Sequence, residues 1–294
     1  MRVPAKVNLA LNVGATDNEG YHALGTLFQA VSLFDDLVAR PAEAGVFRVS
    51  FRGEGSSGLP VDDTNLVVRA ARLLAKTCGM GNLGVEIRVY KRIPVAGGMA
   101  GGSADAAATL IACNQLWGTG LDTGQLHAVA ARLGADVPFL LHGGTAVGTG
   151  RGEKLRSVPV RGSFHWVLAL SHHGLSTPAV FREFDRISAP QPTDIDSGLL
   201  EALADGDARR VGALLRNDLQ RAAFNLQPEL ADVLAMGREA GAIGALVSGS
   251  GPTIAFLAGT KAVADAISDR LVLSSRVRAV RRVHGPVPGA RIVN

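Results

Sequence analysis

Cysteine is almost absent from this sequence, which has only Cys78 and Cys113 in 294 residues. These two cysteines form neither a CxxC pair nor the dense framework of a disulfide-stapled domain, which indicates a reducing compartment. No uncharged apolar run is long enough to span a membrane, and the first residues lack the apolar core of a signal peptide. We therefore expect a cytoplasmic protein with no membrane partner.

Aromatic residues are also scarce, at 5% of the chain, and the formal net charge is only +4. The most basic run, residues 276–284, alternates like a strand and contains no aromatic side chain on which a base could stack. These features argue against nucleic-acid binding. The mild positive charge suits a small anionic substrate, although solvated lysines and arginines would account for it equally well.

Several common site motifs are missing as well. No G-x-x-x-x-G-K-[ST] phosphate loop occurs. The G-x-G-x-x-G at residues 79–84 follows an expected helix and precedes an expected strand, the reverse of the dinucleotide-binding order. Residues 248–251 lack the first glycine of a nucleophile elbow. The histidines are scattered, which favours surface or structural roles over a zinc site.

The chain does contain a glycine-rich stretch at residues 93–108, in which four glycines stand directly before an alanine-rich helix former. Glycine lets the backbone approach a ligand closely, and Ser103 is predicted to be the N-cap of the following helix. Free amides that lead into a helix N-terminus bind anions, because the N–H groups and the helix dipole both favour negative charge. The stretch therefore predicts a phosphate-binding loop, with a flexible surface turn as the alternative.

The first half of the chain alternates strand-like and helix-like segments. Apolar alternation predicts strands at residues 3–13, 24–33, 36–39, 46–51, 85–90 and 144–148. Helical spacing and capping signals predict helices at residues 66–76, 103–117 and 122–133. The last of these helices has Asp122 and Gln125 placed as a capping box, with Gly134 as its stop.

The second half is predicted to follow the order β-α-β-β-α-β, which is the ferredoxin-like order, with extra helices in the first crossover. Its strands are expected at residues 165–170, 243–247, 253–257 and 277–283. Its helices are expected from residue 176 and at residues 199–204, 207–215, 228–240 and 262–271. Residues 151–162 mix charge, proline and glycine, so we place a domain boundary there, between domains 1–155 and 156–294.

Three further features involve polar residues in apolar surroundings. Lys6 and Asn8 lie two apart on an apolar strand and share a face; a buried lysine needs a partner, whereas an edge lysine could extend to solvent. Asp136 stands between a helix stop and apolar residues 138–141, where it is either a helix cap or a functional acid. Residues 248–253 form a second small-residue loop between two strands, or a simple hairpin.

Together these segments resemble the GHMP kinases, the superfamily of galactokinase, homoserine kinase, mevalonate kinase and phosphomevalonate kinase. The resemblance rests on motifs at residues 4–9, 94–103 and 248–252. Further motifs at residues 20–24, 63–66 and 134–139 narrow it to the branch whose substrate carries cytidine diphosphate. Each motif alone is weak, but six in this order are specific, and the resemblance extends over residues 4–259.

The resemblance implies an α+β protein with the two-domain GHMP kinase fold. Residues 1–155 would form an N-terminal ATP-binding domain, similar to a ribosomal-protein fold and containing a left-handed βαβ unit. Residues 156–294 would form a C-terminal ferredoxin-like domain, with the active site in the cleft between the two. The left-handed crossover is implied by the resemblance alone, because parallel crossovers are normally right-handed.

The implied activity is ATP-dependent phosphorylation of a tertiary hydroxyl on a small cytidine diphosphate substrate, a step of isoprenoid precursor synthesis by the non-mevalonate route. ATP and Mg²⁺ are the expected cofactors, and we expect a monomer or a weak homodimer. One alternative is another small-molecule kinase of the superfamily, acting on homoserine, mevalonate or a sugar. The other is a non-catalytic nucleotide-binding regulator on the same fold.

The same resemblance assigns roles to single residues. Asp136 would accept the proton of the substrate hydroxyl, and Lys6 would keep that aspartate ionised and stabilise the attacking oxygen. The nucleotide would be bound by Asn65 at the adenine and, at the phosphates, by Pro94, Gly97, Gly98, Gly101, Gly102 and Ser103. The substrate would be bound by Asn8 and Thr177 and, in a cytosine pocket, by Tyr21, His22 and Phe181.

The glycine-rich stretch departs from the family's pattern at three positions. Met99 replaces the usual leucine and Ala100 replaces a frequent glycine, and both are small losses of backbone freedom. Asp105 stands where asparagine or alanine is frequent. This carboxylate would either interact favourably with the helix dipole or help to hold Mg²⁺, and the sequence leaves both roles open.

Overall fold

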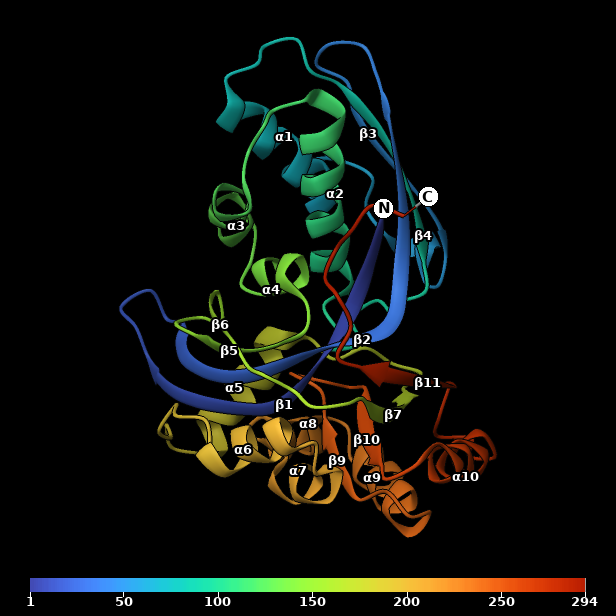
Figure 1. Cartoon of the computed structure of the whole chain (residues 1–294). Helices are drawn as coiled ribbons and strands as arrows, with labels where there is room; N and C mark the ends of the chain where they lie inside the picture. Colours follow the sequence, from blue (N-terminus) through green and yellow to red (C-terminus); the bar gives the residue numbers. More distant parts are fainter. Residues whose placement is uncertain (294) are drawn as a thin grey trace.

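The structure of the protein is a computed structural model, which describes residues 1–293. The described residues form two halves, each built around one sheet, and Figure 1 shows them one above the other. Across these residues, none of the helices combines the length and the apolar character that crossing a membrane requires.

The upper half contains a mixed sheet whose strands follow the order β3-β4-β2-β1-β8, with β5 paired to β2 and β6 paired to β5. Its strands are β1 (Arg2–Thr16), β2 (His22–Pro41), β3 (Phe47–Gly53), β4 (Val85–Lys91), β5 (Thr145–Thr149), β6 (Lys154–Ser157) and β8 (Arg216–Asn217). Its helices are α1 (Leu66–Cys78), α2 (Gly101–Trp117), α3 (Thr123–Ala131) and α4 (Val137–His142), with a short 3₁₀ turn at Ser56–Gly58. Strands β3 and β4 are parallel and joined through α1, which forms a βαβ unit.

The lower half confirms the ferredoxin-like order that the sequence predicts. Its strands β7 (Phe164–Leu170), β9 (Gly244–Val247), β10 (Ile254–Ala258) and β11 (Ala279–Gly285) form an antiparallel sheet in the order β11-β7-β10-β9. Its helices are α5 (Thr177–Ile187), α6 (Ser197–Asp205), α7 (Ala208–Leu214), α8 (Gln220–Leu226), α9 (Glu229–Glu239) and α10 (Lys261–Val272). The sheet order and the α+β class are therefore as expected.

Several boundaries differ from the predicted ones. The two strands predicted at residues 24–33 and 36–39 are one continuous strand, β2, because Asp35 is buried within it rather than placed at a turn. Helix α3 ends at Ala131, before Gly134, although its predicted capping box is present. Four short elements, β6, β8, α4 and α8, are not predicted from the sequence. They are too short to show clear periodicity.

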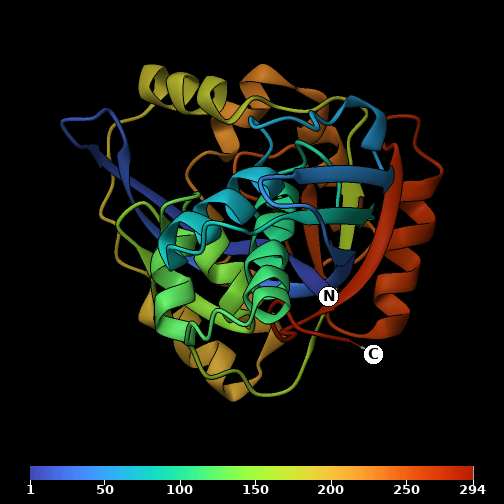
Figure 2. The same ribbon diagram turned by 90° about the horizontal axis from the view of Figure 1, so that it is seen from above.

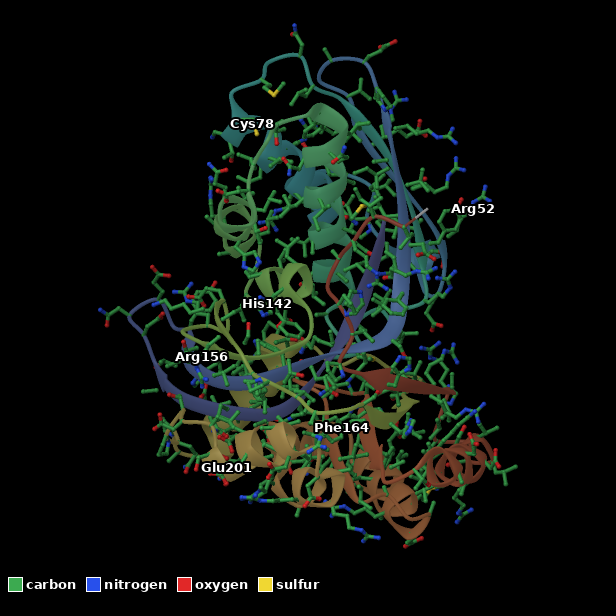
Figure 3. The ribbon with its side chains drawn as sticks, in the orientation of Figure 1. Arg52, Cys78, His142, Arg156, Phe164 and Glu201 are labelled. Atoms are coloured by element: carbon green, nitrogen blue, oxygen red, sulfur yellow. The ribbon has the colours of Figure 1, made fainter. Side chains whose placement is uncertain are left out.

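The two halves share one hydrophobic core. The largest buried cluster includes Val7 and Leu27 of the upper sheet together with Trp166 and Leu257 of the lower one. Figure 3 shows Phe164, at the start of β7, between the two halves, whereas Arg52 lies at the outer edge of the upper half. Packing across the junction therefore fixes how the two sheets face each other.

Chain segments also cross between the halves. Strand β8 joins the upper sheet beside β1, and β1 packs its far end, at Leu11 and Val13, against α5 and α8. The C-terminal segment returns to the start of β1, where Arg2 and Arg291 exchange backbone hydrogen bonds of 2.8 and 2.9 Å (Figures 1 and 2). The domain boundary at residue 155 stays a prediction.

A buried hydrogen bond ties the two sheets together, and it gives a test of this shared core. The Trp166 indole N–H donates to Gln29 Oε1 over 2.9 Å, and both residues are fully buried. We expect Gln29→Leu to lower the free energy of unfolding by about 1–3 kcal/mol, because the indole N–H loses its acceptor. Urea denaturation followed by circular dichroism measures this loss. The exposed Gln115→Leu on α2 is the control, and an equal loss in both variants would contradict the expectation.

Candidate active site

The glycine loop, residues 92–100, runs from the end of β4 to the start of α2. Three of its residues have positive φ, namely Ala96 at 53°, Gly98 at 73° and Ala100 at 60°. Helix α2 begins at Gly101 with Ala100 in the N-cap position, and no side chain caps it. The prediction that Ser103 is the N-cap is therefore wrong, because the left-handed Ala100 starts the helix three residues earlier.

The first turn of α2 consequently offers its free N–H groups to a ligand bound at the glycine loop. Gly101, Gly102 and Ser103 form this turn, and α2 continues for 17 residues. An uncapped N-terminus of a long helix, preceded by a glycine loop, favours an anion. This geometry agrees with the phosphate-binding loop predicted from the sequence.

A second loop, residues 248–253 between β9 and β10, packs directly against the glycine loop. The Ser248 hydroxyl donates to the Gly98 carbonyl over 3.2 Å. A Cβ atom on Gly98 would lie 2.2 Å from the Ser248 carbonyl oxygen, so only glycine fits there. The two small-residue loops thus meet across the junction of the two halves. A simple hairpin, the alternative for residues 248–253, would not need this contact.

Lys6 and Asn8 lie beside these loops on β1, and both side chains are buried. Lys6 Nζ donates to Asn8 Oδ1 over 2.6 Å, and Asn8 Nδ2 donates to Thr26 Oγ1 over 2.8 Å. A Cβ atom on Gly249 would lie 3.2 Å from Lys6 Nζ, which shows how closely the second loop approaches the lysine. Lys6 is therefore a buried lysine with partners rather than an edge lysine.

Asp136 supplies the charge that faces Lys6. Its Oδ2 atom lies 3.9 Å from Lys6 Nζ, and one third of its side chain is exposed. Asp136 precedes α4, yet its side chain accepts no capping hydrogen bond there. The capping alternative is thus not realised, and the carboxylate remains accessible to a ligand beside the lysine.

The ionisation of Lys6 depends on this partner. Burial lowers the pKa of Lys6 below its ordinary value, and the Asp136 carboxylate offsets part of that lowering. The ammonium also lies 5.5 Å from the centre of the Phe28 ring, a distance at which a cation–π interaction contributes.

A cleft of about 270 Å³ borders the glycine loop. Its walls are Pro94, Val95, Ala96 and Gly97 of the loop and, from the lower half, residues that include Leu170, His172, His173 and Thr253. Lys6 and Asp136 do not line this cleft. The cleft therefore shares the glycine loop as a wall but does not include the buried lysine and its aspartate.

The predicted cytosine-pocket residues are partly assembled. The His22 and Phe181 rings stack with centroids 5.3 Å apart, whereas Tyr21 is 55% exposed and lies under the Arg151 guanidinium at 3.9 Å. Both His22 nitrogens have partners, the Gly14 carbonyl at 2.8 Å and the Asp185 carboxylate at 3.0 Å. A hydrogen bond from His22 to a base stays a prediction.

Two other predicted residues have structural contacts. Thr177 lies at the second loop, where its hydroxyl is 2.8 Å from the Ser250 hydroxyl. Asn65 caps α1 by accepting from the Val67 N–H over 2.9 Å, and it donates to the Pro60 carbonyl over 2.7 Å. Its proposed contact with adenine stays a prediction.

The Asp105 carboxyl group is buried against Lys91 rather than exposed to a ligand. It is only 2% exposed, and it accepts from Lys91 Nζ over 2.7 Å. Sequence reasoning missed Lys91, although the signal was present. Lys91 continues the buried phase of β4, in which Val85, Ile87 and Val89 alternate with more exposed residues.

Supporting residues from distant parts of the chain were also missed. Asn217 on β8 donates to the carbonyls of Val247 and Gly249, over 2.7 and 2.8 Å, and so supports the second loop. Three other side chains likewise contact predicted site residues: Thr26 accepts from Asn8, Asp185 pairs with His22, and Arg151 packs on the Tyr21 ring. No local pattern marks these side chains, because their partners lie far away in the sequence.

Comparison with known proteins agrees with this geometry. The family model for the GHMP kinases N terminal domain matches residues 65–144, and the GHMP kinases C terminal model matches residues 199–274. The chain belongs to the GHMP kinase family. Its curated relatives carry the name 4-diphosphocytidyl-2-C-methyl-D-erythritol kinase and place it in that branch of the family. As a member of this family, the protein is a small-molecule kinase that uses ATP.

The relatives match over nearly their whole length. The kinase of Thermobifida fusca is 54% identical, with 100% of this chain and 97% of the relative covered. The kinase of Nocardia farcinica is 53% identical, with 100% and 96% covered. A crystal structure of a 4-(cytidine 5'-diphospho)-2C-methyl-D-erythritol kinase is 35% identical, covers 97% of this chain and 98% of its own, and superposes with a TM-score of 0.76.

Kinases outside this branch of the family share the same fold. A homoserine kinase from Cytophaga hutchinsonii is only 22% identical, yet it covers 98% of this chain and 94% of its own, with a TM-score of 0.77. At that identity the likeness supports the fold alone.

The Lys6–Asp136 pair generates a prediction about ionisation. Asp136→Asn removes the opposite charge 3.9 Å away, so we expect the pKa of Lys6 to fall further. Side-chain NMR titration of the lysines measures it. The exposed Lys154 on β6 serves as the internal reference. An unchanged Lys6 titration in Asp136→Asn would contradict the electrostatic coupling.

Proposed function

We propose that the protein transfers the γ-phosphoryl group of ATP to the tertiary 2-hydroxyl of 4-diphosphocytidyl-2-C-methyl-D-erythritol, giving the 2-phosphate and ADP. This reaction belongs to the non-mevalonate route to isoprenoid precursors. The observation that carries the proposal is the buried Lys6 beside Asp136, whose side chain is one third exposed, at the meeting point of two small-residue loops. Relatives that bear the name of this activity, about half identical over the full chain, support the choice of substrate.

In this proposal the glycine loop and the first turn of α2 bind the ATP phosphates. Pro94, Gly97 and Gly98 supply the loop's shape, and Gly101, Gly102 and Ser103 present N–H groups at the helix N-terminus. The uncapped helix end supports this role, because its dipole and free donors stabilise phosphate charge without a P-loop lysine. Asn65, at the start of the neighbouring α1, would border the adenine.

Asp136 would act as the general base. As the substrate oxygen attacks the γ-phosphorus, its O–H proton passes to the Asp136 carboxylate, and the bond from the γ-phosphorus to the bridging oxygen of ADP breaks. Lys6 would hold Asp136 ionised before transfer and stabilise negative charge on the attacking oxygen. Asn8 and Thr177 would orient the acceptor, and the closeness of Asn8 to Lys6 supports this assignment.

Mg²⁺ is part of the proposal as an ion that enters with ATP. Among residues 1–293, no group of three or more His, Cys, Asp or Glu side chains could hold a metal by itself. Mg²⁺ commonly uses one or two carboxylates together with substrate phosphates, so these residues fit an ion held mainly by the nucleotide. Such an ion would neutralise phosphate charge during transfer.

The cytosine base would bind near Tyr21, His22 and Phe181. The stacked His22 and Phe181 rings offer an aromatic face, and exposed Tyr21 offers a second one. Base stacking on aromatic rings supports selection of a nucleotide-linked acceptor over homoserine or mevalonate, which carry no base.

We further propose that the protein is cytoplasmic, has no nucleic-acid or membrane partner, and is a monomer or weak homodimer with domains at residues 1–155 and 156–294. Analytical ultracentrifugation tests the oligomeric state.

A substrate panel tests the proposed acceptor. We expect ATP consumption with 4-diphosphocytidyl-2-C-methyl-D-erythritol to exceed that with homoserine, galactose or mevalonate by at least about 10³-fold in kcat/KM, because only this acceptor fills the base pocket. A coupled ADP assay measures it. A preference for one of the other three acceptors would leave the kinase class standing and remove the proposed substrate.

Replacing the proposed base tests the mechanism. Asp136→Ala should lower kcat by about 10²–10⁴-fold, because no other group accepts the hydroxyl proton. Binding of a non-hydrolysable ATP analogue, measured by calorimetry, should stay within about threefold of wild type. The control is Asp63→Ala, at an exposed aspartate ahead of α1. A kcat near wild type in Asp136→Ala would refute the base assignment.

A further inference from the structure

Three charged side chains are buried together beneath the glycine loop. Lys91 is 4% exposed, Asp105 is 2% exposed and Asp35 is fully buried. They come from β4, α2 and β2, respectively. The phosphoryl-transfer mechanism uses none of them, and burying three ionisable groups is costly unless each has a partner.

Asp35 fixes the entry to the loop. Its Oδ1 atom accepts from the backbone N–H groups of Arg92 and Ile93, over 2.5 and 2.9 Å, and its Oδ2 atom pairs with Lys91. Arg92 and Ile93 are the first two residues of the glycine loop. A single carboxylate thus determines the direction in which the chain leaves β4.

Lys91 fixes the exit from the loop. Its Nζ atom donates to the Gly101 carbonyl over 3.3 Å and to Asp105 Oδ2 over 2.7 Å, both on the first turns of α2. Through Asp35 and Lys91, the two ends of the loop are therefore joined at one buried point. We call Asp35, Lys91 and Asp105 the loop clamp.

The loop needs such a constraint. Ala96 and Ala100 both have positive φ, a region that costs a non-glycine residue of order 1 kcal/mol or more. Residues held in this region persist only where the surrounding structure determines them. The clamp joins the loop's ends and therefore limits the conformations that its N–H groups adopt.

Burial and neighbouring charges shift the pKa values of Asp105 and Lys91. Burial and the neighbouring Asp35 raise the pKa of Asp105 well above its ordinary value, while Lys91 opposes that rise. The two carboxylates raise the pKa of Lys91 despite its burial. Asp105 Oδ1 has no hydrogen-bond partner among the described residues. The clamp thus holds one ammonium group, that of Lys91, between two buried carboxyl groups, and the raised pKa of Asp105 favours its protonated form.

We propose that Lys91 is a positioning residue for ATP, which holds the glycine loop and the start of α2 in the arrangement that binds the phosphates. This inference rests on the proposed function of the loop as the ATP phosphate site. If the ion pairs of Lys91 were purely structural, their loss would lower only the stability of the protein. The proposal predicts in addition a loss of affinity for the nucleotide, with no change in affinity for the acceptor.

The main test compares nucleotide and acceptor parameters in Lys91→Met. We expect the Kd for a non-hydrolysable ATP analogue and the KM for ATP to rise at least about tenfold, since small misplacements of binding groups cost this much. The KM for the cytidine diphosphate acceptor should stay within about twofold. The exposed Lys154→Met is the control. An unchanged analogue Kd, with only a lower Tm, would overturn the proposal.

Variants of Asp105 keep the test decisive if Lys91→Met does not fold. Asp105→Asn keeps a side-chain oxygen that can accept from Lys91, so its analogue Kd should stay within about twofold of wild type. Asp105→Ala suits an alanine-rich helix but frees Lys91 from α2, and its analogue Kd should rise about fivefold. Equal Kd values in Asp105→Ala and wild type would also overturn the proposal.

The analogue Kd separates this inference from the proposed function. It is measured without an acceptor, so it reports on the clamp even if the wild-type enzyme prefers another acceptor. A wild-type protein that fails to bind the ATP analogue would refute the ATP site, and with it both proposals. A wild-type protein that binds the analogue, with a Lys91→Met variant of equal affinity, would refute the clamp alone.

Discussion

The buried positive charge of Lys6 is the constraint around which the two halves of the protein are arranged. A desolvated ammonium needs acceptors and an opposite charge, and here Asn8 supplies the first and Asp136 the second. The second loop closes over the same atom from the lower sheet, at Gly249. Because Asp136 belongs to the upper half and Gly249 to the lower one, the surroundings of this charge come from both halves, and the shared core holds them together.

The second constraint is that the two loops approach each other and Lys6 closely through their backbones. This close approach explains why small residues recur where the two halves meet. At Gly98 a side chain would collide with the second loop, and at Gly249 it would press on Lys6. The two loops therefore form a backbone surface, in which N–H groups and carbonyls rather than side chains face the ligand. A surface of this kind suits phosphate, since its charge is spread over several oxygens that many weak donors can match.

Local sequence patterns singled out Lys6 and Asp136, because polar residues within apolar runs are costly, but they left structural roles open for both. The resemblance to the GHMP kinases supplied the expected roles of these residues and of Asn8, whereas the ferredoxin-like order followed from alternating segments. The start of α2 was mispredicted, because Ser103 is a better cap than Ala100 by propensity, while the left-handed Ala100 is imposed by the loop. Asn217 and Asp185 could not be predicted, since their partners lie on segments that only the folded chain brings together.

Lys6 and Lys91 show why burial alone does not reveal a lysine's role. Both are buried on strands that are otherwise largely apolar, and both pair with aspartate. The difference lies in the carboxylates: the partner of Lys6 is one third exposed, whereas both partners of Lys91 are almost fully buried. An accessible carboxylate can exchange a proton with a ligand, and a buried one can only hold its partner in place. The exposure of the acid therefore distinguishes Lys6, the lysine of the proposed reaction, from Lys91, which we propose supports the glycine loop.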